Sequence, residues 1–323
     1  MRTLVVDTTT ADGKLLTQPI FDPSGRKLFA KGRQISKEDI ALLTSAGLAQ
    51  VSVAVLEDGD IPEQEAAMQL AAQASHGALT PQLAPGGRAN IVAVENCCLT
   101  VEENSLRALN QLGVVSAATR PHFSYAAAGQ RVGTINTPPF AVPRHKFHEA
   151  LRLVLERGPL VEAHPIRQPI VAVLYCDPLK GDRARGLYEA IMRTRLERVG
   201  ANAAFVLSCL EEEGPIARNL DHLLRARPTI VIIASTTAPA GPNDAVGRGM
   251  EAVGCKLESY LAPVEPGNLL LLSYIGDVPV FCAPGCYRSP RTNVVDRVLP
   301  PLLAKRRLTA RDISAFGHGG LLQ

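Results

Sequence analysis

The sequence contains no tryptophan, and aromatic residues make up only 4% of it. Proteins that bind single-stranded nucleic acid without sequence preference stack bases on aromatic side chains, so this kind of binding is not expected. Charge of one sign is also lacking, because 34 Lys and Arg against 31 Asp and Glu leave a formal net charge of only +3. So small a charge gives no reason to expect a nucleic acid or a membrane surface as a partner.

Long apolar runs are missing as well. None approaches the roughly 18 residues of a membrane-spanning helix. The N-terminus, Met1 to Lys14, does not place a basic segment before an apolar one, as a secretory leader does. We therefore expect a cytoplasmic protein in which the seven cysteines are reduced thiols. The absence of a Walker-type loop and of a G-x-S-x-G motif disfavours P-loop NTPases and serine hydrolases.

A chain of 323 residues with 46% hydrophobic residues is long enough for more than one domain. Changes of pattern predict a small α+β domain over residues 1–75, a β-rich domain over 88–143, an α/β domain over 165–305 and a C-terminal tail or linker over 306–323. The Gly- and Pro-containing stretch 76–87 is typical of a linker.

Local signals in the first domain are specific. Pro23-Ser24-Gly25 predicts a hairpin turn between two short strands, at residues 19–22 and 27–30. Ser36 is placed to cap a helix that begins at Lys37.

The C-terminal half has the pattern of a parallel sheet. Its strands are short continuous apolar runs separated by helices, which is typical of a sheet covered on both faces. The predicted strands are residues 170–176, 203–208 and 229–234, and the predicted helices are 183–199, 215–226 and 244–253. We therefore expect an α/β fold, with a three-layer, mostly parallel sheet in the C-terminal half and a mixed, β-rich N-terminal half.

Ligands of such sheets bind at the carboxyl ends of the strands. The loop after the third strand offers hydroxyls and backbone amides at Ser235, Thr236, Thr237 and Gly241, and it leads into a helix. These groups suit a phosphate or a pterin. Asp244 ends the loop, where it can cap the helix, hold a metal ion or orient a phosphate, and these roles are not exclusive.

Acidic residues follow the second strand. Glu211 and Glu212 can bind Mg²⁺ beside a phosphate, or they can simply place favourable charge at a helix N-terminus. Asp182 opens the first helix of the sheet domain, where the adjacent Arg183 can contact an anion or lie on a solvated helix face.

These residues resemble a known family. Residues 182–189 are similar to the entry of the first helix in molybdopterin adenylyltransferases. Glu211-Glu212 followed by Ile216 resembles their acidic pair, and residues 229–244 resemble their strand, ligand loop and aspartate.

A closer resemblance is to the N-terminal part of bacterial proteins that join a molybdopterin-binding domain to a nucleotidyltransferase domain. It is carried by residues 263–272, 276–286 and 308–321, and it extends over nearly the whole chain. The resemblance implies that the sheet domain binds molybdopterin or the molybdenum cofactor and takes part in its biosynthesis, maturation or delivery. Implied partners are the pterin, a molybdoenzyme or a nucleotidyltransferase, and further copies of the chain.

The resemblance also implies roles for single residues. The ligand is expected at the loop from Ser235 to Asp244 and at the Pro284–Gly285 turn, with Asp182 and Ser289 as further contacts. Asp244 would bind Mg²⁺ or orient the phosphate, and Glu211 or Glu212 would assist.

The loop departs from the family pattern, because Ser-Thr-Thr-Ala-Pro-Ala-Gly replaces a loop with paired glycines. Without those glycines the backbone approaches a ligand less closely. This departure favours one alternative to a binding protein, an interaction module that has lost the ligand, and disfavours nucleotide transfer more than pterin binding. The other alternative is a Mg-dependent nucleotidyl or metal transferase acting on molybdopterin.

Overall fold

The computed structural model describes residues 1–22, 24–84 and 86–322. The chain forms two compact units, each assembled from separate segments. Unit 1 comprises Met1–Val92, Glu102–Thr119 and Arg131–Val161, and unit 2 comprises Ala93–Val101, Arg120–Gln130 and the chain from Glu162 onward.

The first part of unit 1 is a small antiparallel sheet with one α-helix. Its elements are β1 (Arg2–Asp7), the 3-10 helix η1 (Thr8–Thr10), β2 (Leu15–Leu16), β3 (Ile20–Phe21), β4 (Lys27–Phe29), α1 (Lys37–Ser45) and β5 (Gln50–Val55). The predicted pairing of two short strands is confirmed by β3 and β4, while Pro23 of the predicted turn lies outside the described residues. The predicted cap is also confirmed: Ser36 accepts a hydrogen bond from the Asp39 backbone N–H, and the Asp39 carboxylate accepts one from Ser36 N–H.

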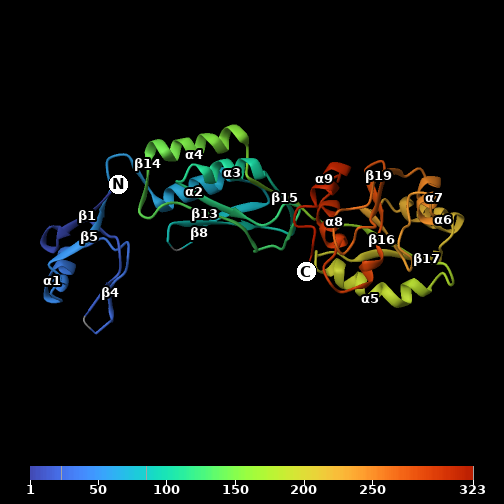
Figure 1. Ribbon diagram of the computed structural model, residues 1–323, viewed down its shortest axis with the longest axis horizontal. Helices are drawn as coiled ribbons and strands as arrows, with labels where there is room; N and C mark the ends of the chain where they lie inside the picture. The colour runs from blue at the N-terminus through green and yellow to red at the C-terminus, as the bar shows by residue number, and fades with distance from the viewer. Residues whose placement is uncertain (23, 85, 323) are drawn as a thin grey trace. The chain divides into compact units, whose positions relative to one another are not determined.

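The rest of unit 1 combines a second sheet, of strand order β11-β13-β9-β8, with three helices (Figure 1). Its elements are β6 (Asp60–Pro62), α2 (Glu63–Ala74), β7 (Ser75–Gly77), β8 (Leu79–Ala84), β9 (Arg88–Ala93), α3 (Glu103–Gln111), β11 (Ser116–Thr119), β13 (Arg131–Asn136), β14 (Ala141–Pro143) and α4 (Arg144–Arg157). The linker predicted over residues 76–87 is wrong, because β7 and β8 lie there; Pro85 is outside the described residues. Pro81 is tolerated because β8 is an edge strand.

Unit 2 is built on a mixed sheet of six strands in the order β17-β16-β18-β21-β20-β19. β20 runs against its two neighbours, and the other pairs are parallel. The elements of this unit are β10 (Cys97–Val101), β12 (Tyr125–Ala126), β15 (Val161–Pro165), β16 (Val171–Asp177), α5 (Arg183–Glu197), β17 (Ala203–Leu210), α6 (Glu213–Arg225), β18 (Ile230–Ser235), α7 (Ala245–Ala252), β19 (Lys256–Tyr260), β20 (Leu271–Ile275), β21 (Val278–Cys282), the 3-10 helix η2 (Gly285–Arg288), α8 (Val294–Leu303) and α9 (Ala310–Ala315).

Both faces of this sheet carry apolar side chains, because β16 is buried along its whole length. Val173 and Tyr175 on one face share a core with residues of α5 and α8. Ala172 and Leu174 on the other face share a second core with residues of α6 and α7 (Figure 1). Burial on both faces explains why this strand has a continuous rather than an alternating apolar pattern.

The C-terminal residues are part of the fold rather than the linker that the sequence suggested. α9 begins at a capping box formed by Thr309 and Asp312. Leu308, Ile313 and Phe316 are buried in the same core as α8. The chain therefore remains packed on unit 2 beyond residue 305.

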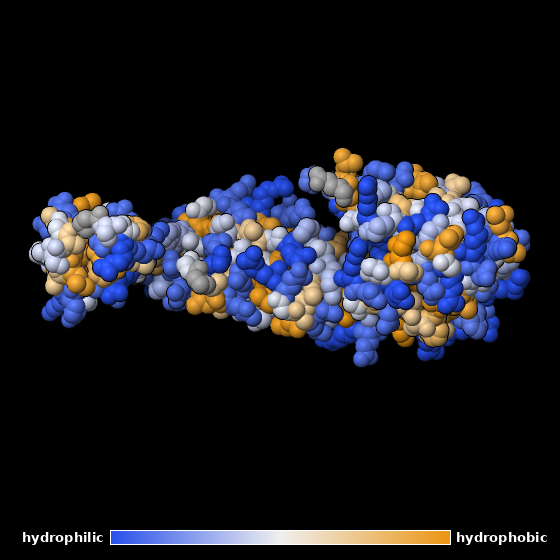
Figure 2. All heavy atoms as spheres, turned by 90° about the horizontal axis from the view of Figure 1, so that it is seen from below, coloured by the Kyte–Doolittle hydropathy of each residue, from blue (hydrophilic) through white to orange (hydrophobic). Residues whose placement is uncertain are grey.

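Large hydrophobic side chains that remain exposed are dispersed. On the face shown in Figure 2 they lie among hydrophilic residues rather than in one broad patch. Over the described residues, no helix has the length and apolar character needed to cross a membrane.

Candidate functional site

Three neighbouring parallel strands of unit 2 end at one edge of the sheet. β16 lies between β17 and β18, and these strands end at Asp177, Leu210 and Ser235. The loops that the sequence selected as ligand-binding therefore leave the sheet side by side, and two hydrogen-bond networks connect them.

The first network is centred on Asp177, whose side chain is fully buried. One carboxylate oxygen accepts hydrogen bonds from the backbone N–H groups of Leu179 and Lys180, at 2.8 and 2.9 Å. The other accepts from the Thr236 hydroxyl at 2.7 Å and from the Arg183 guanidinium at 3.0 Å. The predicted contact residue Thr236 is thus fixed by a neighbouring strand.

Burial by itself would raise the pKa of Asp177. The hydrogen bonds from Lys180 N–H, Thr236 and Leu179 N–H, together with the positive charge of Arg183, outweigh it and lower the pKa to about 2. The carboxylate therefore stays ionised at neutral pH.

The second network is centred on Glu211, which directly follows β17. Its two carboxylate oxygens accept hydrogen bonds from the hydroxyls of Ser235 and Thr237. Ser235 in turn accepts a hydrogen bond from Thr237 N–H at 3.0 Å. Three predicted site residues, Glu211, Ser235 and Thr237, are therefore brought together.

Asp244 occupies the N-cap of α7. One carboxylate oxygen accepts from Gly247 N–H at 2.8 Å, and the other accepts from Ala240 N–H at 2.8 Å. This arrangement stabilises both the helix start and the preceding loop. Its predicted role as a Mg²⁺ ligand stays a prediction; among the described residues, no group of three or more His, Cys, Asp or Glu side chains is arranged to hold a metal ion.

Arg288 connects this loop to the Pro284–Gly285 turn. Its guanidinium donates to the carbonyl of Gly285 at 2.7 Å and to that of Thr236 at 3.1 Å. Its planar group also lies 5.6 Å from the ring centroid of Tyr188. The two segments that the sequence proposed as ligand contacts are therefore held together by a cation. Gly241 borders open space, since a methyl group added to it would meet no atom within 4 Å.

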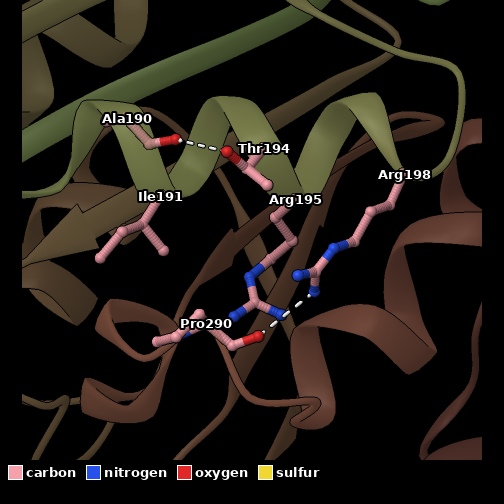
Figure 3. A pocket seen from close by; sticks show the side chains of 6 residues that line it. All are labelled: Ala190, Ile191, Thr194, Arg195, Arg198 and Pro290. Carbon is pink, nitrogen blue, oxygen red and sulfur yellow. Dashed lines mark hydrogen bonds between the residues drawn. The ribbon is translucent and has the colours of Figure 1, made fainter.

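Arg195 orders the backbone around the predicted contact Ser289. Only 2% of the Arg195 side chain is exposed, and it donates to the carbonyl of Ser289 at 2.7 Å and to the carboxylate of Asp296. Figure 3 shows Arg195 and Arg198 extending from α5 toward the loop that carries Pro290, beside a cavity of about 180 Å³. The position of Ser289 is thus fixed by the hydrogen bond that its main-chain carbonyl accepts from Arg195.

Two predicted residues are not part of these networks. Asp182 and Glu212 precede α5 and α6 as exposed N-cap residues whose side chains make no capping hydrogen bond. Each is therefore a matched control for the stability contributed by a nearby network or cap residue, because its own side chain makes no capping hydrogen bond.

Sequence reasoning missed Asp177, Arg288 and Arg195. Asp177 had a usable signal, since a carboxylate that ends a fully apolar parallel strand must be buried at the ligand edge. Arg288 and Arg195 had none, because the contacts that connect them to the site are with groups distant in sequence: the Thr236 carbonyl for Arg288, and the Ser289 carbonyl and Asp296 carboxylate for Arg195.

No protein-family model and no curated protein matches the chain. Among solved structures it is similar to a molybdenum cofactor biosynthesis protein from Pyrococcus furiosus, with 13% identity and a TM-score of 0.27, over 94% of this chain and 64% of the other. It is also similar to two structures of the molybdopterin biosynthesis protein MoeA from Pyrococcus horikoshii. The first has 12% identity and a TM-score of 0.34, over 96% of this chain and 76% of the other. The second has 11% identity and a TM-score of 0.27, over 94% of this chain and 74% of the other. At such TM-scores these likenesses carry no argument about the chain's function.

Proposed function

We propose that the chain binds molybdopterin or the molybdenum cofactor at the carboxyl edge of the unit 2 sheet and serves in its biosynthesis or delivery. The proposal joins the resemblance of the sequence motifs to one structural observation. Ser235, Thr236 and Thr237, at the end of the third strand, are tied by side-chain hydrogen bonds to acidic residues that end or follow the other two strands.

This arrangement prepares the loop for a ligand. Because Asp177 and Glu211 hold the hydroxyls, the backbone after Thr237 is positioned without help from the ligand. A prepared site loses less conformational entropy on binding than a mobile one. The open space beside Gly241 lets a ligand approach this backbone.

Charges of both signs suit a phosphorylated pterin. Arg288, whose guanidinium donates to main-chain carbonyls, supplies positive charge near the loop, which favours the phosphate; Arg183 is already paired with Asp177. A carboxylate has about four acceptor positions, so Glu211 retains capacity after accepting from Ser235 and Thr237. That capacity matches the amino and ring N–H donors of a pterin.

The test is to purify the protein from a host that makes molybdopterin, oxidise it and measure the fluorescence of any released pterin. We expect pterin with the wild type and with Asp221→Asn, which changes an exposed carboxylate of α6 outside the candidate site. The amount should fall at least about tenfold with Thr236→Val, because the loop loses its tie to Asp177. Circular dichroism would confirm that each variant is folded. If neither the wild type nor any variant releases pterin, the proposal is contradicted.

The transferase alternative requires a separate measurement. It predicts turnover of Mg-ATP with molybdopterin that collapses in Asp244→Asn. Retention of pterin without such turnover would leave the chain a binding protein.

A further inference from the structure

A second cavity of unit 2 lies at the opposite edge of the six-stranded sheet. It has a volume of about 410 Å³, within the range of roughly 300 to 1,000 Å³ that is usual for small-molecule sites. Its walls come from the segments that enter β18 and β21 and from the end of α8. The lining includes Thr229, Asp277, Val278 and Leu302. Since β18 and β21 are parallel and begin here, this edge is the reverse of the one that carries Asp177.

Positive charge dominates the cavity. Four cationic side chains, Arg227, Lys305, Arg306 and Arg307, line it, whereas Asp277 is the only acidic residue among the described lining residues. Within the described part of the chain, the side chains of Arg227, Lys305 and Arg306 make no hydrogen bond or ion pair. Their charges are therefore uncompensated by the protein at close range.

Arg307 differs from the other three because it is fixed. Its guanidinium forms an ion pair with Glu258 at 3.0 Å and stacks 3.9 Å from the ring centroid of Tyr274. The Tyr274 hydroxyl donates to the carbonyl of Leu308 at 3.0 Å and accepts from its N–H at 2.9 Å. With buried Pro228 and Pro279 also in the lining, the cavity has a stiff wall beside exposed cations.

Helix ends explain only part of this charge. α6 and α8 finish next to the cavity, and each C-terminus carries about half a negative charge. Together with Asp277 these ends supply about two negative charges against the three unpaired cations, so net positive charge remains and an anion would still be attracted.

We propose that this cavity binds a small phosphate-bearing molecule with at least two negative charges, such as a diphosphate. The volume admits a small molecule, and the long, separate side chains of Arg227, Lys305 and Arg306 can converge on neighbouring phosphate groups. The site is independent of the pterin site, because it shares no residue with it.

The experiment is isothermal titration calorimetry of the whole chain with inorganic pyrophosphate, with sodium sulfate and sodium chloride at equal ionic strength as comparisons. The test variant is Lys305→Gln/Arg306→Gln. The control is Arg193→Gln/Lys256→Gln, which removes the same formal charge from exposed positions of unit 2 outside the cavity. Circular dichroism would verify that both variants are folded.

We expect pyrophosphate to bind more tightly than sulfate. The test variant should weaken binding at least about tenfold, while the control should change it by less than about twofold. Asp177→Asn should leave pyrophosphate binding unchanged, which separates this result from the fate of the pterin proposal. The absence of binding at millimolar pyrophosphate, equal weakening in both charge variants, or tighter binding of a single-stranded oligonucleotide than of pyrophosphate would overturn the inference.

Discussion

Among single residues, Asp177 connects most of the carboxyl edge of the sheet. It accepts hydrogen bonds from its own loop, from Thr236 directly after β18 and from Arg183 of α5. A buried carboxylate without such partners would be costly. The same contacts that offset its burial therefore hold the candidate ligand loop.

Asp177→Asn is expected to destabilise the protein by about 1–3 kcal/mol, because an amide cannot satisfy both Thr236 and Arg183 as a carboxylate does. The free energy of unfolding in urea would measure this. Asp182→Asn, at an exposed position nearby in the chain, should change stability by less than about 0.5 kcal/mol. Equal losses of stability in the two variants would contradict the stabilising role given to the contacts of Asp177.

The lowered pKa of Asp177 predicts a specific pH dependence. A carboxyl group with a folded pKa of about 2 adds stability above the unfolded pKa of about 3.9. This contribution declines as the pH falls from about 4 toward 2. At about pH 5, roughly one unit above the unfolded pKa, the carboxyl group is almost fully ionised in both the folded and the unfolded chain. The difference in unfolding free energy between wild type and Asp177→Asn should therefore be constant from about pH 5 to 7 and should shrink in more acidic solution. A difference that grows on acidification would show that the charged form is not the stabilised one.

At the scale of elements, the N-termini of α7 and α6 differ in how their backbone N–H groups are capped. α7 is short, and Asp244 satisfies the backbone N–H of Gly247 as well as that of Ala240 in the preceding loop. The α6 start lacks this support, because the Glu212 side chain makes no capping bond.

Asp244→Ala should therefore cost about 1 kcal/mol of stability, and Glu212→Ala should cost less than about 0.5 kcal/mol. Thermal unfolding followed by circular dichroism would compare them. If Asp244→Ala leaves stability unchanged, the carboxylate is not a structural cap, and its predicted role toward a metal or phosphate would gain weight.

The elements that sequence analysis predicted correctly depend on neighbouring residues. Ser36 and Asp39 form the cap of α1, and the apolar run that becomes β16 is recognisable by itself. β7 and β8 were missed because Gly77 and Pro81 are typical of linkers, while the position at a sheet edge that tolerates such residues depends on the tertiary fold.

The candidate site shows the same limit. Ser235, Thr236 and Thr237 were identified from the order of strand and loop, but their pairing with Asp177 and Glu211 depends on the topology of the sheet. The buried Arg195 could not be inferred, because it acts on main-chain carbonyls about 90 residues further along the chain.

For the whole molecule, the last residues illustrate how far unit 2 extends. A methyl group on Gly320 would lie 2.2 Å from the Pro263 carbonyl oxygen and 2.7 Å from that of Phe316. Gly320→Ala should therefore destabilise unit 2 by about 1–3 kcal/mol, because backbone atoms must move. Gly186→Ala, in α5 with open space around it, should instead stabilise the protein by about 0.5–1 kcal/mol. Urea unfolding of both variants would decide; a neutral Gly320→Ala would show that the terminal residues are not packed.

The interleaved order of the two units has a consequence for dividing the protein. Cys98, Phe123 and Tyr125 contribute to the core that contains α8, although they precede the rest of unit 2 in the chain. A single crossover with a related gene inside this region would thus combine core residues of unit 2 from two different parents. Exchange of one complete unit would instead need several junctions, one at each point where the chain passes between the units.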